Sequence, residues 1–175
     1  MEFWDVYDQY RKKTGKVIER GQPLGKDDYH LVVHVVIFNS KGEMLIQQRQ
    51  SFKEGWPNMW DITVGGSALQ GENSQQAAAR ELFEEISIVY DFKRIRPTIT
   101  TNHAYGFNDI YILELDLDLH TLTLQYEEVQ DVKWATKEEI LSLITDHRFI
   151  PYYPSFIDLI FDTKTSMDII KPSVK

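Results

Sequence analysis

Short runs of β-branched and aromatic residues, separated by polar turns, make up the first third of the chain. Residues 3–7 and 17–19 fit short strands. Residues 30–38, which read HLVVHVVIF, are apolar on both faces and rich in valine, and this pattern is typical of a buried strand. Residues 39–42 form a polar turn, so we expect residues 43–49 to return as the second strand of a hairpin.

The rest of the chain alternates between extended and helical patterns. Further strands are predicted at residues 60–64, 92–101, 109–116 and 131–135. Helices are predicted at residues 73–88, 136–145 and 152–162. Thr136, with Glu139 three residues later, is the capping-box signature of a helix start. Strands interleaved with helices predict a mixed α/β fold, an α/β/α sandwich with a mixed central sheet. We expect one domain that spans residues 1–175.

Composition narrows the class of protein. The 175 residues include no cysteine, which excludes disulfides and cysteine nucleophiles. The sequence shows neither a signal peptide nor an apolar run of about 18 residues, so we expect a cytoplasmic protein that does not cross a membrane. The net charge of −8 disfavours a nucleic-acid polymer as partner, because its phosphates would be repelled. An anionic small molecule could still bind if a divalent cation reversed the local charge.

The helix predicted at residues 73–88 carries three glutamates, Glu81, Glu84 and Glu85. At 100° per residue, their side chains fall within an arc of about 100°. We expect the opposite face to bury against the core, and its residues are Ala79, Leu82, Phe83, Ile86 and Val89. Like charges at this spacing cost about 0.2–0.5 kcal/mol per pair, and a bound cation would reverse the sign of that interaction.

Three glutamates alone would fit a solvated helix face, but a wider pattern surrounds them. Its fixed positions are Gly66, Glu72, Arg80, Glu81, Leu82, Glu84 and Glu85. With average residue usage, a chain of this length would match this spacing by chance on the order of once in 10⁵ to 10⁶. We therefore interpret the pattern as a functional motif.

The motif resembles the signature of the Nudix family, and the resemblance extends over roughly residues 4–140. It implies a loop–helix–loop that binds Mg²⁺ or Mn²⁺, in a hydrolase that cleaves a diphosphate linked to another group in a small molecule. The family pattern ends in Glu-Glu-any-Gly-apolar, and here Ser87 stands at the glycine position. Since that glycine often ends the helix, we expect the serine to carry the helix one or two residues further, toward Asp91.

The resemblance also implies roles for individual residues. The implied metal ligands are the carbonyl of Gly66 and the carboxylates of Glu81, Glu84 and Glu85. Salt bridges from Glu72 and Arg80 would orient that set. Such oxygen donors suit hard divalent ions, which lower the pKa of bound water and neutralise charge developing at phosphorus. The expected substrate contacts are Arg49, Gly65 and Gly66. Many family members have an extra acid in the turn at residues 127–128, which reaches the metal or acts as the general base, and of Glu127 and Glu128 we prefer Glu128 for this role.

A second resemblance leads to an alternative function. Residues 30–61 are similar to Nudix proteins related to isopentenyl-diphosphate isomerase. Those isomerases have a reactive cysteine and a metal-binding histidine where this chain has Gly65 and Ser67, and another metal histidine falls at Pro23. Without these groups, protonation of an alkene has no evident chemical route, so hydrolysis is favoured. The group attached to the diphosphate, a nucleoside or another, stays open, and so does the oligomeric state, with a homodimer among the alternatives.

Histidine and aromatic residues near the motif give weaker signals. His30 and His34 share one face of the strand predicted at residues 30–38, and we expect them to pack there instead of binding a metal. His103 lies in a polar turn and has no predicted role. Aromatic residues are more often part of a core than of a binding site. Those that could contact a base are Trp56, Trp60, Tyr105 and Phe107.

Overall fold

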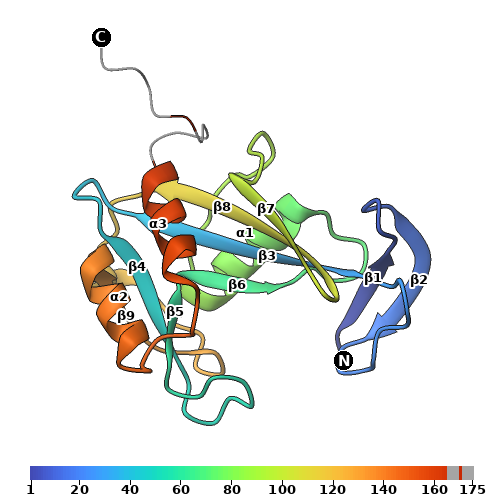
Figure 1. Ribbon diagram of the computed structural model, residues 1–175, viewed down its shortest axis with the longest axis horizontal. Helices are drawn as coiled ribbons and strands as arrows, with labels where there is room; N and C mark the ends of the chain where they lie inside the picture. Colours follow the sequence, from blue (N-terminus) through green and yellow to red (C-terminus); the bar gives the residue numbers. More distant parts are fainter. Residues whose placement is uncertain (165–169, 171–175) are drawn as a thin grey trace. The chain divides into compact units, whose positions relative to one another are not determined.

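Two long strands, β3 (His30–Phe38) and β8 (Gly106–Glu114), run through both of the units into which the chain divides (Figure 1). The computed structural model describes residues 1–164 and 170. The first unit holds residues 1–35, 64–111 and 122–125. The second unit holds residues 36–63, residues 112–121 and the chain from residue 126 onward.

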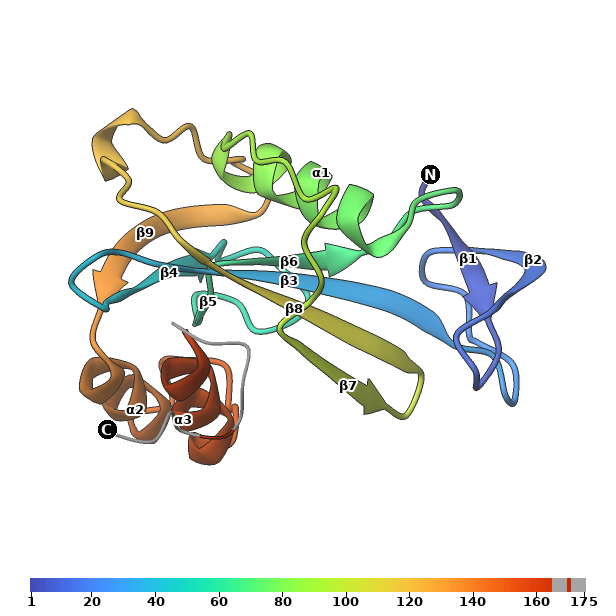
Figure 2. The same cartoon turned by 90° about the horizontal axis from the view of Figure 1, so that it is seen from above.

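The first unit contains the helix that carries the motif. Its elements are β1 (Phe3–Tyr7), β2 (Lys13–Glu19), the first part of β3, β6 (Val64–Ser67), α1 (Ser74–Ile86), β7 (Ile99–His103) and the first part of β8. β1 and β2 form an antiparallel hairpin. β6 pairs with β3 and β7 pairs with β8, both antiparallel. Helix α1 lies along β6, as Figure 2 shows, so the motif helix is supported by the strand that contributes Gly65 and Gly66.

The second unit has β4 (Met44–Arg49) as its central strand. Its other elements are β5 (Trp60–Ile62), the 3₁₀ helix η1 (Leu119–Thr121), β9 (Val129–Ala135), α2 (Lys137–Thr145) and α3 (Pro154–Thr163). β4 pairs antiparallel with both β5 and β9, and the predicted hairpin joins it to β3. Helices α2 and α3 pack against each other (Figure 2). α2 begins with the predicted capping box of Thr136 and Glu139.

Strands and three helices, counted over the described residues, make a mixed α+β fold and confirm the predicted class. The strand at His30–Phe38 has the predicted limits. No helix within residues 1–164 is long and apolar enough to cross a membrane. The single domain over residues 1–175 stays a prediction.

Several predicted strands differ from the structure in their limits. β2 begins at Lys13, four residues before the predicted start, and β8 is Gly106–Glu114 where residues 109–116 were predicted. β7 starts only at Ile99, and residues 92–98 are not part of a strand. Pro97 has no N–H to donate to a neighbouring strand, and the buried ring of Phe92 packs on Tyr111 with 5.1 Å between ring centroids. Residues 60–64 divide between two strands, because β5 pairs with β4 and β6 pairs with β3.

Burial along β3 changes at the middle of the strand. Leu31, Val33 and Val35 are buried. The residues that alternate with them, His30, Val32 and His34, are half-buried. From Val35 onward every residue of the strand is buried. The prediction of a strand buried on both faces is therefore correct for its second half and wrong for its first half.

The buried face of helix α1 is shifted from the predicted one, although Leu82 and Ile86 are buried as predicted. Its buried residues are Ala77, Ala78, Leu82, Glu85 and Ile86. The prediction that Phe83 and Val89 belong to the core is wrong, since their side chains are 54% and 84% exposed. At 100° per residue the buried arc is centred near Glu85 and not opposite it. In this orientation the carboxylate of Glu81 lies directly against Gly66 of β6.

The C-terminal end of α1 also differs from the expectation. The helix ends at Ile86, and Ser87 adopts the left-handed conformation with φ 59° and ψ 30°. Its backbone N–H donates to the carbonyls of Leu82 and Phe83, as in the glycine caps of other helices. The prediction that Ser87 extends the helix is therefore wrong. These capping hydrogen bonds offset the cost of a side chain in this conformation, about 1–2 kcal/mol.

Replacing Ser87 with glycine should stabilise the protein, because glycine adopts positive φ without steric cost. We expect Ser87→Gly to raise the free energy of unfolding by about 0.5–1 kcal/mol, or the midpoint of thermal unfolding by about 1–4 °C. Ser87→Ala is the matched control, because it keeps the Cβ and should give no gain. Thermal unfolding of the three proteins measures the effect, and a loss of stability in Ser87→Gly would contradict it.

Candidate active site

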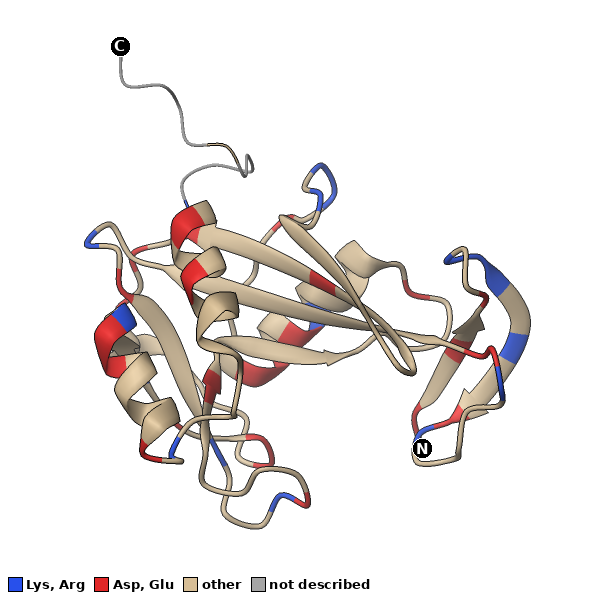
Figure 3. Cartoon of the chain, in the orientation of Figure 1, with Lys and Arg blue, Asp and Glu red and all other residues tan. Residues whose placement is uncertain are grey.

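Arg80 of helix α1 lies at the centre of a cluster of carboxylates from this helix and from the loop that precedes it. Its Nε and NH2 donate to the two oxygens of Glu72 at 2.7 and 2.9 Å, a bidentate pair. Its NH1 donates to Glu81 Oε1 at 2.8 Å and to Glu84 Oε2 at 2.9 Å. NH2 also donates to the carbonyl of Ser67 in β6 at 3.0 Å. One guanidinium therefore holds three carboxylates, and Figure 3 shows the acidic and basic positions together on α1.

The electrostatics of this cluster follow from burial and from the neighbouring charges. Burial by itself lowers the pKa of Arg80, but Glu72, Glu81 and Glu84 outweigh it and raise that pKa above its usual value. Burial raises the pKa of Glu81, and the charge of Arg80 opposes this shift. The positive charge of Arg80 thus offsets the repulsion between Glu81 and Glu84.

Two glycines of β6 allow close approach of side chains. A Cβ at Gly66 would overlap the carboxylate of Glu81, so a side chain at this position would displace that carboxylate from its present place. A Cβ at Gly65 would lie 2.5 Å from Nδ1 of His34 and 3.3 Å from the carbonyl oxygen of Val33. The register that pairs Val33 with Gly66 and His34 with Gly65 sets both distances.

Glu85 has a different environment from the other two glutamates. Its side chain is only 4% exposed, and its backbone carbonyl accepts the N–H of Gln125 at 3.0 Å. Within residues 1–164, no three His, Asp or Glu side chains converge in an arrangement that could hold a metal ion. The three-carboxylate metal site therefore stays a prediction.

The donors that are brought together do suit a divalent cation. Glu81 and Glu84 share one nitrogen of Arg80, so their carboxylates are held next to each other. Glu81 also contacts Gly66, the residue whose carbonyl is a predicted ligand. Hard ions such as Mg²⁺ prefer carboxylate and carbonyl oxygens, and here the carboxylates of Glu81 and Glu84 are bound to the same nitrogen of Arg80.

Arg49 belongs to a polar cluster in the second unit. Its Nε donates to the carbonyl of Gly55 at 3.0 Å, and its NH1 lies 4.0 Å from Oδ2 of Asp61. The hydroxyl of Tyr152 donates to Asp61 Oδ1 at 3.0 Å. Burial raises the pKa of Asp61 to about 6, against the hydrogen bond from Tyr152 and the charge of Arg49. Sequence reasoning missed Asp61 and Tyr152, although an aspartate inside a short apolar strand is a detectable signal.

Glu128 also lies in the second unit, in the predicted turn before β9. Lys53 Nζ donates to its carboxylate at 2.6 Å. The carbonyl of Glu128 accepts the N–H of Gln50 at 3.1 Å, so both backbone and side chain are fixed. The role of Glu128 as a base stays a prediction.

The histidines of the first unit contact neighbouring side chains and backbone groups. The ring of His30 stacks on Trp4 with centroids 4.7 Å apart, and its Nδ1 bonds to the carbonyl of Tyr105 at 3.0 Å. Burial lowers the pKa of His34 to about 4, although a hydrogen bond with Asn108 opposes this. His103 contacts His30 edge to face at 5.5 Å.

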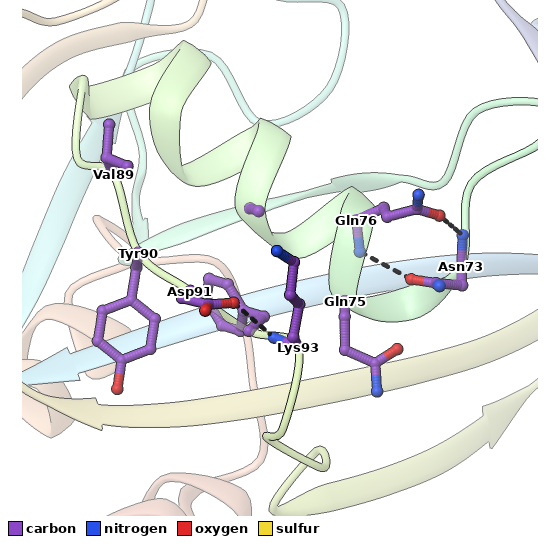
Figure 4. A pocket seen from close by; sticks show the side chains of 9 residues that line it. Asn73, Gln75, Gln76, Val89, Tyr90, Asp91 and Lys93 are labelled. Carbon is purple, nitrogen blue, oxygen red and sulfur yellow. Dashed lines mark hydrogen bonds between the residues drawn. The ribbon is translucent and has the colours of Figure 1, made fainter.

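An open groove of about 640 Å³ lies beside α1, between that helix and residues 89–93 (Figure 4). Asn73 and Gln76 at its rim bond to each other's backbone in the capping box of α1, as the dashed lines show. None of the predicted site residues lines this groove. It is therefore distinct from the cluster around Arg80.

Comparison with known sequences supports the family that the motif indicates. The family model described as NUDIX domain matches residues 28–156. The chain is 46% identical to a Nudix hydrolase of Listeria monocytogenes over 169 residues, which cover 97% of this chain and 99% of that protein. It is 24% identical to an isopentenyl-diphosphate Delta-isomerase of Salmonella arizonae over 78% of each chain.

Comparison with solved structures agrees with the fold. The crystal structure of DR0079 from Deinococcus radiodurans superposes with a TM-score of 0.72 at 25% identity, over 91% of this chain and 97% of that one. A MutT protein from Methanosarcina mazei shares the fold with a TM-score of 0.59 at 20% identity, over 79% of this chain and 96% of that one.

The raised pKa of Asp61 makes stability depend on pH. Between the unfolded value of 3.8 and the folded value of about 6, the folded protein binds more protons, so its stability falls as the pH rises through this window. In Asp61→Asn the side chain at this position cannot ionise, so this loss of stability should be absent. Between pH 4 and pH 7.5, the free energy of unfolding of Asp61→Asn should therefore rise relative to that of the wild type by up to about 3 kcal/mol.

Denaturant unfolding at several pH values measures this difference. The exposed Asp131→Asn is the control and should show a difference from the wild type that is nearly independent of pH. If Asp61→Asn loses stability relative to the wild type as the pH rises, the raised pKa is wrong.

Proposed function

The chain belongs to the Nudix family of pyrophosphohydrolases, and from this membership we propose that it cleaves a diphosphate linkage in a small nucleoside diphosphate derivative. Nudix hydrolases generally use divalent metal ions, and we propose Mg²⁺ or Mn²⁺ for this one. Water would attack phosphorus, and the products would be two smaller phosphates. A cytoplasmic location and a homodimer stay predictions.

One observation carries the proposal. A single nitrogen of Arg80 binds both Glu81 at 2.8 Å and Glu84 at 2.9 Å, and Glu72 fixes the same guanidinium from the other edge. Two carboxylates are thereby held side by side next to Gly66 in an otherwise repulsive arrangement. The single positive charge of Arg80 compensates only one of the three negative charges of Glu72, Glu81 and Glu84, so the cluster keeps a net charge of −2 (three minus one). This remaining negative charge favours binding of a divalent cation and, through it, of an anionic substrate.

Each of the predicted site residues would then have a defined task. Glu81, Glu84, Glu85 and the carbonyl of Gly66 would hold the ion. When bound, the ion would supply positive charge at the diphosphate and lower the pKa of the attacking water. Glu72 and Arg80 would keep Glu81 and Glu84 in place. Arg49, with its donors directed by Gly55 and Asp61, would bind a phosphate oxygen. Glu128, oriented by Lys53, would accept the proton of the water.

The isomerase alternative gains no support from the environment of Gly65. A side chain at this position would meet His34 Nδ1 at 2.5 Å, so a cysteine could not be placed there without moving His34. The isomerase relative is also less similar than the Nudix hydrolase of Listeria monocytogenes, at 24% against 46% identity. Hydrolysis is therefore the function that we propose.

A panel of diphosphate compounds, incubated with the protein and Mg²⁺ or Mn²⁺, tests this function. The panel should include nucleoside diphosphate sugars, dinucleotides, nucleoside triphosphates and coenzyme A. In water labelled with ¹⁸O, the label should appear in one phosphate product, because the attack is on phosphorus. Deuterium uptake from heavy water by isopentenyl diphosphate, dependent on the enzyme, would instead support the isomerase.

Substitution of the glutamates should abolish turnover without unfolding the protein. We expect Glu84→Gln and Glu85→Gln each to lower kcat by about two orders of magnitude or more, because each removes a charged ligand. Glu138→Gln, an exposed position on α2, is the control and should keep full activity. Activity near that of the wild type in both variants would exclude the proposed ligands.

Glu128→Gln separates a general base from a metal ligand. If Glu128 is the base, this substitution should slow single-turnover hydrolysis by about 10²–10⁴-fold and leave the affinity for Mn²⁺ unchanged. Metal titration followed by rapid-quench measurements gives both quantities. Loss of Mn²⁺ binding would show that Glu128 is a ligand and that the base lies elsewhere.

A further inference from the structure

The hairpin of β1 and β2 precedes the part of the chain that the family model matches. That model begins at residue 28, whereas β1 is Phe3–Tyr7 and β2 is Lys13–Glu19. The hairpin therefore lies outside the part of the chain that the family model matches. It nevertheless contacts the loop before α1, the loop that carries Glu72 of the motif.

Three hydrogen bonds join the hairpin to this loop. The carbonyl of Phe3 accepts the N–H of Gln70 at 2.7 Å. Asp5 Oδ2 accepts the N–H of Gly71 at 2.8 Å. Lys13 Nζ donates to the carbonyl of Glu72 at 2.9 Å. The hairpin thus binds three consecutive residues of the loop.

Asp5 and Lys13 also bind each other. Lys13 Nζ lies 2.6 Å from Asp5 Oδ2, the same oxygen that accepts the N–H of Gly71. Burial raises the pKa of Asp5, but its hydrogen bonds to Lys13 and Gly71 outweigh burial, so the pKa is lowered. The ion pair therefore fixes the peptide groups of Gly71 and Glu72 from one side.

The loop itself is a tight turn. Gly71 has φ +90°, and the N–H of Glu72 donates to the carbonyl of Leu69 at 3.0 Å. In return, Glu72 Oε2 accepts the N–H of Leu69 at 2.8 Å. The backbone position of Glu72 consequently determines where its carboxylate meets the guanidinium of Arg80.

We propose that Asp5 and Lys13 are positioning residues for the candidate active site, because they fix Glu72 and, through Arg80, the carboxylates of Glu81 and Glu84. The inference rests on the proposed function for its effect on catalysis. It requires no contact between the hairpin and the substrate. Its structural part, the placement of Arg80 by the hairpin, can be measured without any activity.

The hairpin is anchored firmly enough to have this role. Arg11, in the turn between β1 and β2, binds the buried Asp109 of β8 at 2.7 Å. Trp4 stacks on His30 of β3 with ring centroids 4.7 Å apart. Tyr7 exchanges backbone hydrogen bonds with Tyr29 at 2.8 and 3.0 Å. The hairpin is thus fixed to the strands of the first unit on one side and to the loop on the other.

Lys13 is suited to a test because its ion pair lies near the surface. The Lys13 side chain is 41% exposed, and exposed ion pairs contribute little to stability. A displacement of about 1 Å at a catalytic group, in contrast, can lower the rate by about 10²-fold. Substitution of Lys13 should therefore lower the rate of hydrolysis strongly and the stability of the protein only slightly.

The experiment compares Lys13→Met with Lys16→Met. Both positions lie on β2, but Lys16 pairs with Asp28 at 3.0 Å and makes no hydrogen bond to the loop in the described residues. We expect Lys13→Met to lower kcat by about tenfold or more, with KM nearly unchanged and a raised half-saturation concentration of Mg²⁺. Lys16→Met should match the wild type, and Lys13→Arg should restore most of the rate. Thermal unfolding should show all three variants folded.

A second measurement separates this inference from the proposed function. The Nε–H signal of Arg80 in ¹H–¹⁵N spectra, assigned by its loss in Arg80→Lys, reports the hydrogen bond to Glu72 in the metal-free protein. It should shift or broaden in Lys13→Met and in Asp5→Asn, and stay in place in Lys16→Met. If that signal is unchanged in Lys13→Met, the positioning role is wrong, whatever the activity. If the signal moves but the wild type hydrolyses no diphosphate, the positioning stands and the proposed function fails.

Discussion

The bidentate pair between Arg80 and Glu72 is the interaction on which the site depends. Arg80 has five N–H donors, and in this protein they bind Glu72, Glu81, Glu84 and the carbonyl of Ser67. Because the guanidinium is planar and rigid, fixing one edge of it on Glu72 fixes the direction of the other edge. Two like-charged carboxylates can then lie on adjacent turns of one helix without separating.

The second constraint is the short distance between helix α1 and strand β6. A side chain at Gly66 would displace the carboxylate of Glu81, because that carboxylate lies where the Cβ would be. The register between β3 and β6 places Gly66 opposite Val33, so the strand pairing determines how close α1 approaches. The loop between β6 and α1 then has little freedom, since the hairpin of β1 and β2 binds residues Gln70, Gly71 and Glu72.

Local patterns were sufficient to predict the parts of the fold that depend on neighbouring residues. The valine-rich run of β3 and the capping box of Thr136 and Glu139 involve interactions within a few residues, and both were predicted correctly. The cluster around Arg80 was predicted because its spacing is characteristic of a family. Asp61 was missed because its partners, Arg49 and Tyr152, are 12 and 91 residues away in the chain. No periodicity in the sequence brings such residues together.

The sequence also did not predict which face of α1 is exposed at Phe83 and buried at Glu85. The physical reason for this difference concerns the candidate active site. A helical wheel assumes that the most apolar face is buried, yet here Glu85 is 4% exposed and Phe83 is 54% exposed. Burying a carboxylate while exposing a phenyl ring opposes the hydrophobic effect, so packing alone would not select this orientation. It does turn Glu81 toward β6 and Arg80 toward Glu72. Departures from the hydrophobic rule are expected where a site requires a geometry that packing does not favour, and in α1 this departure coincides with the motif.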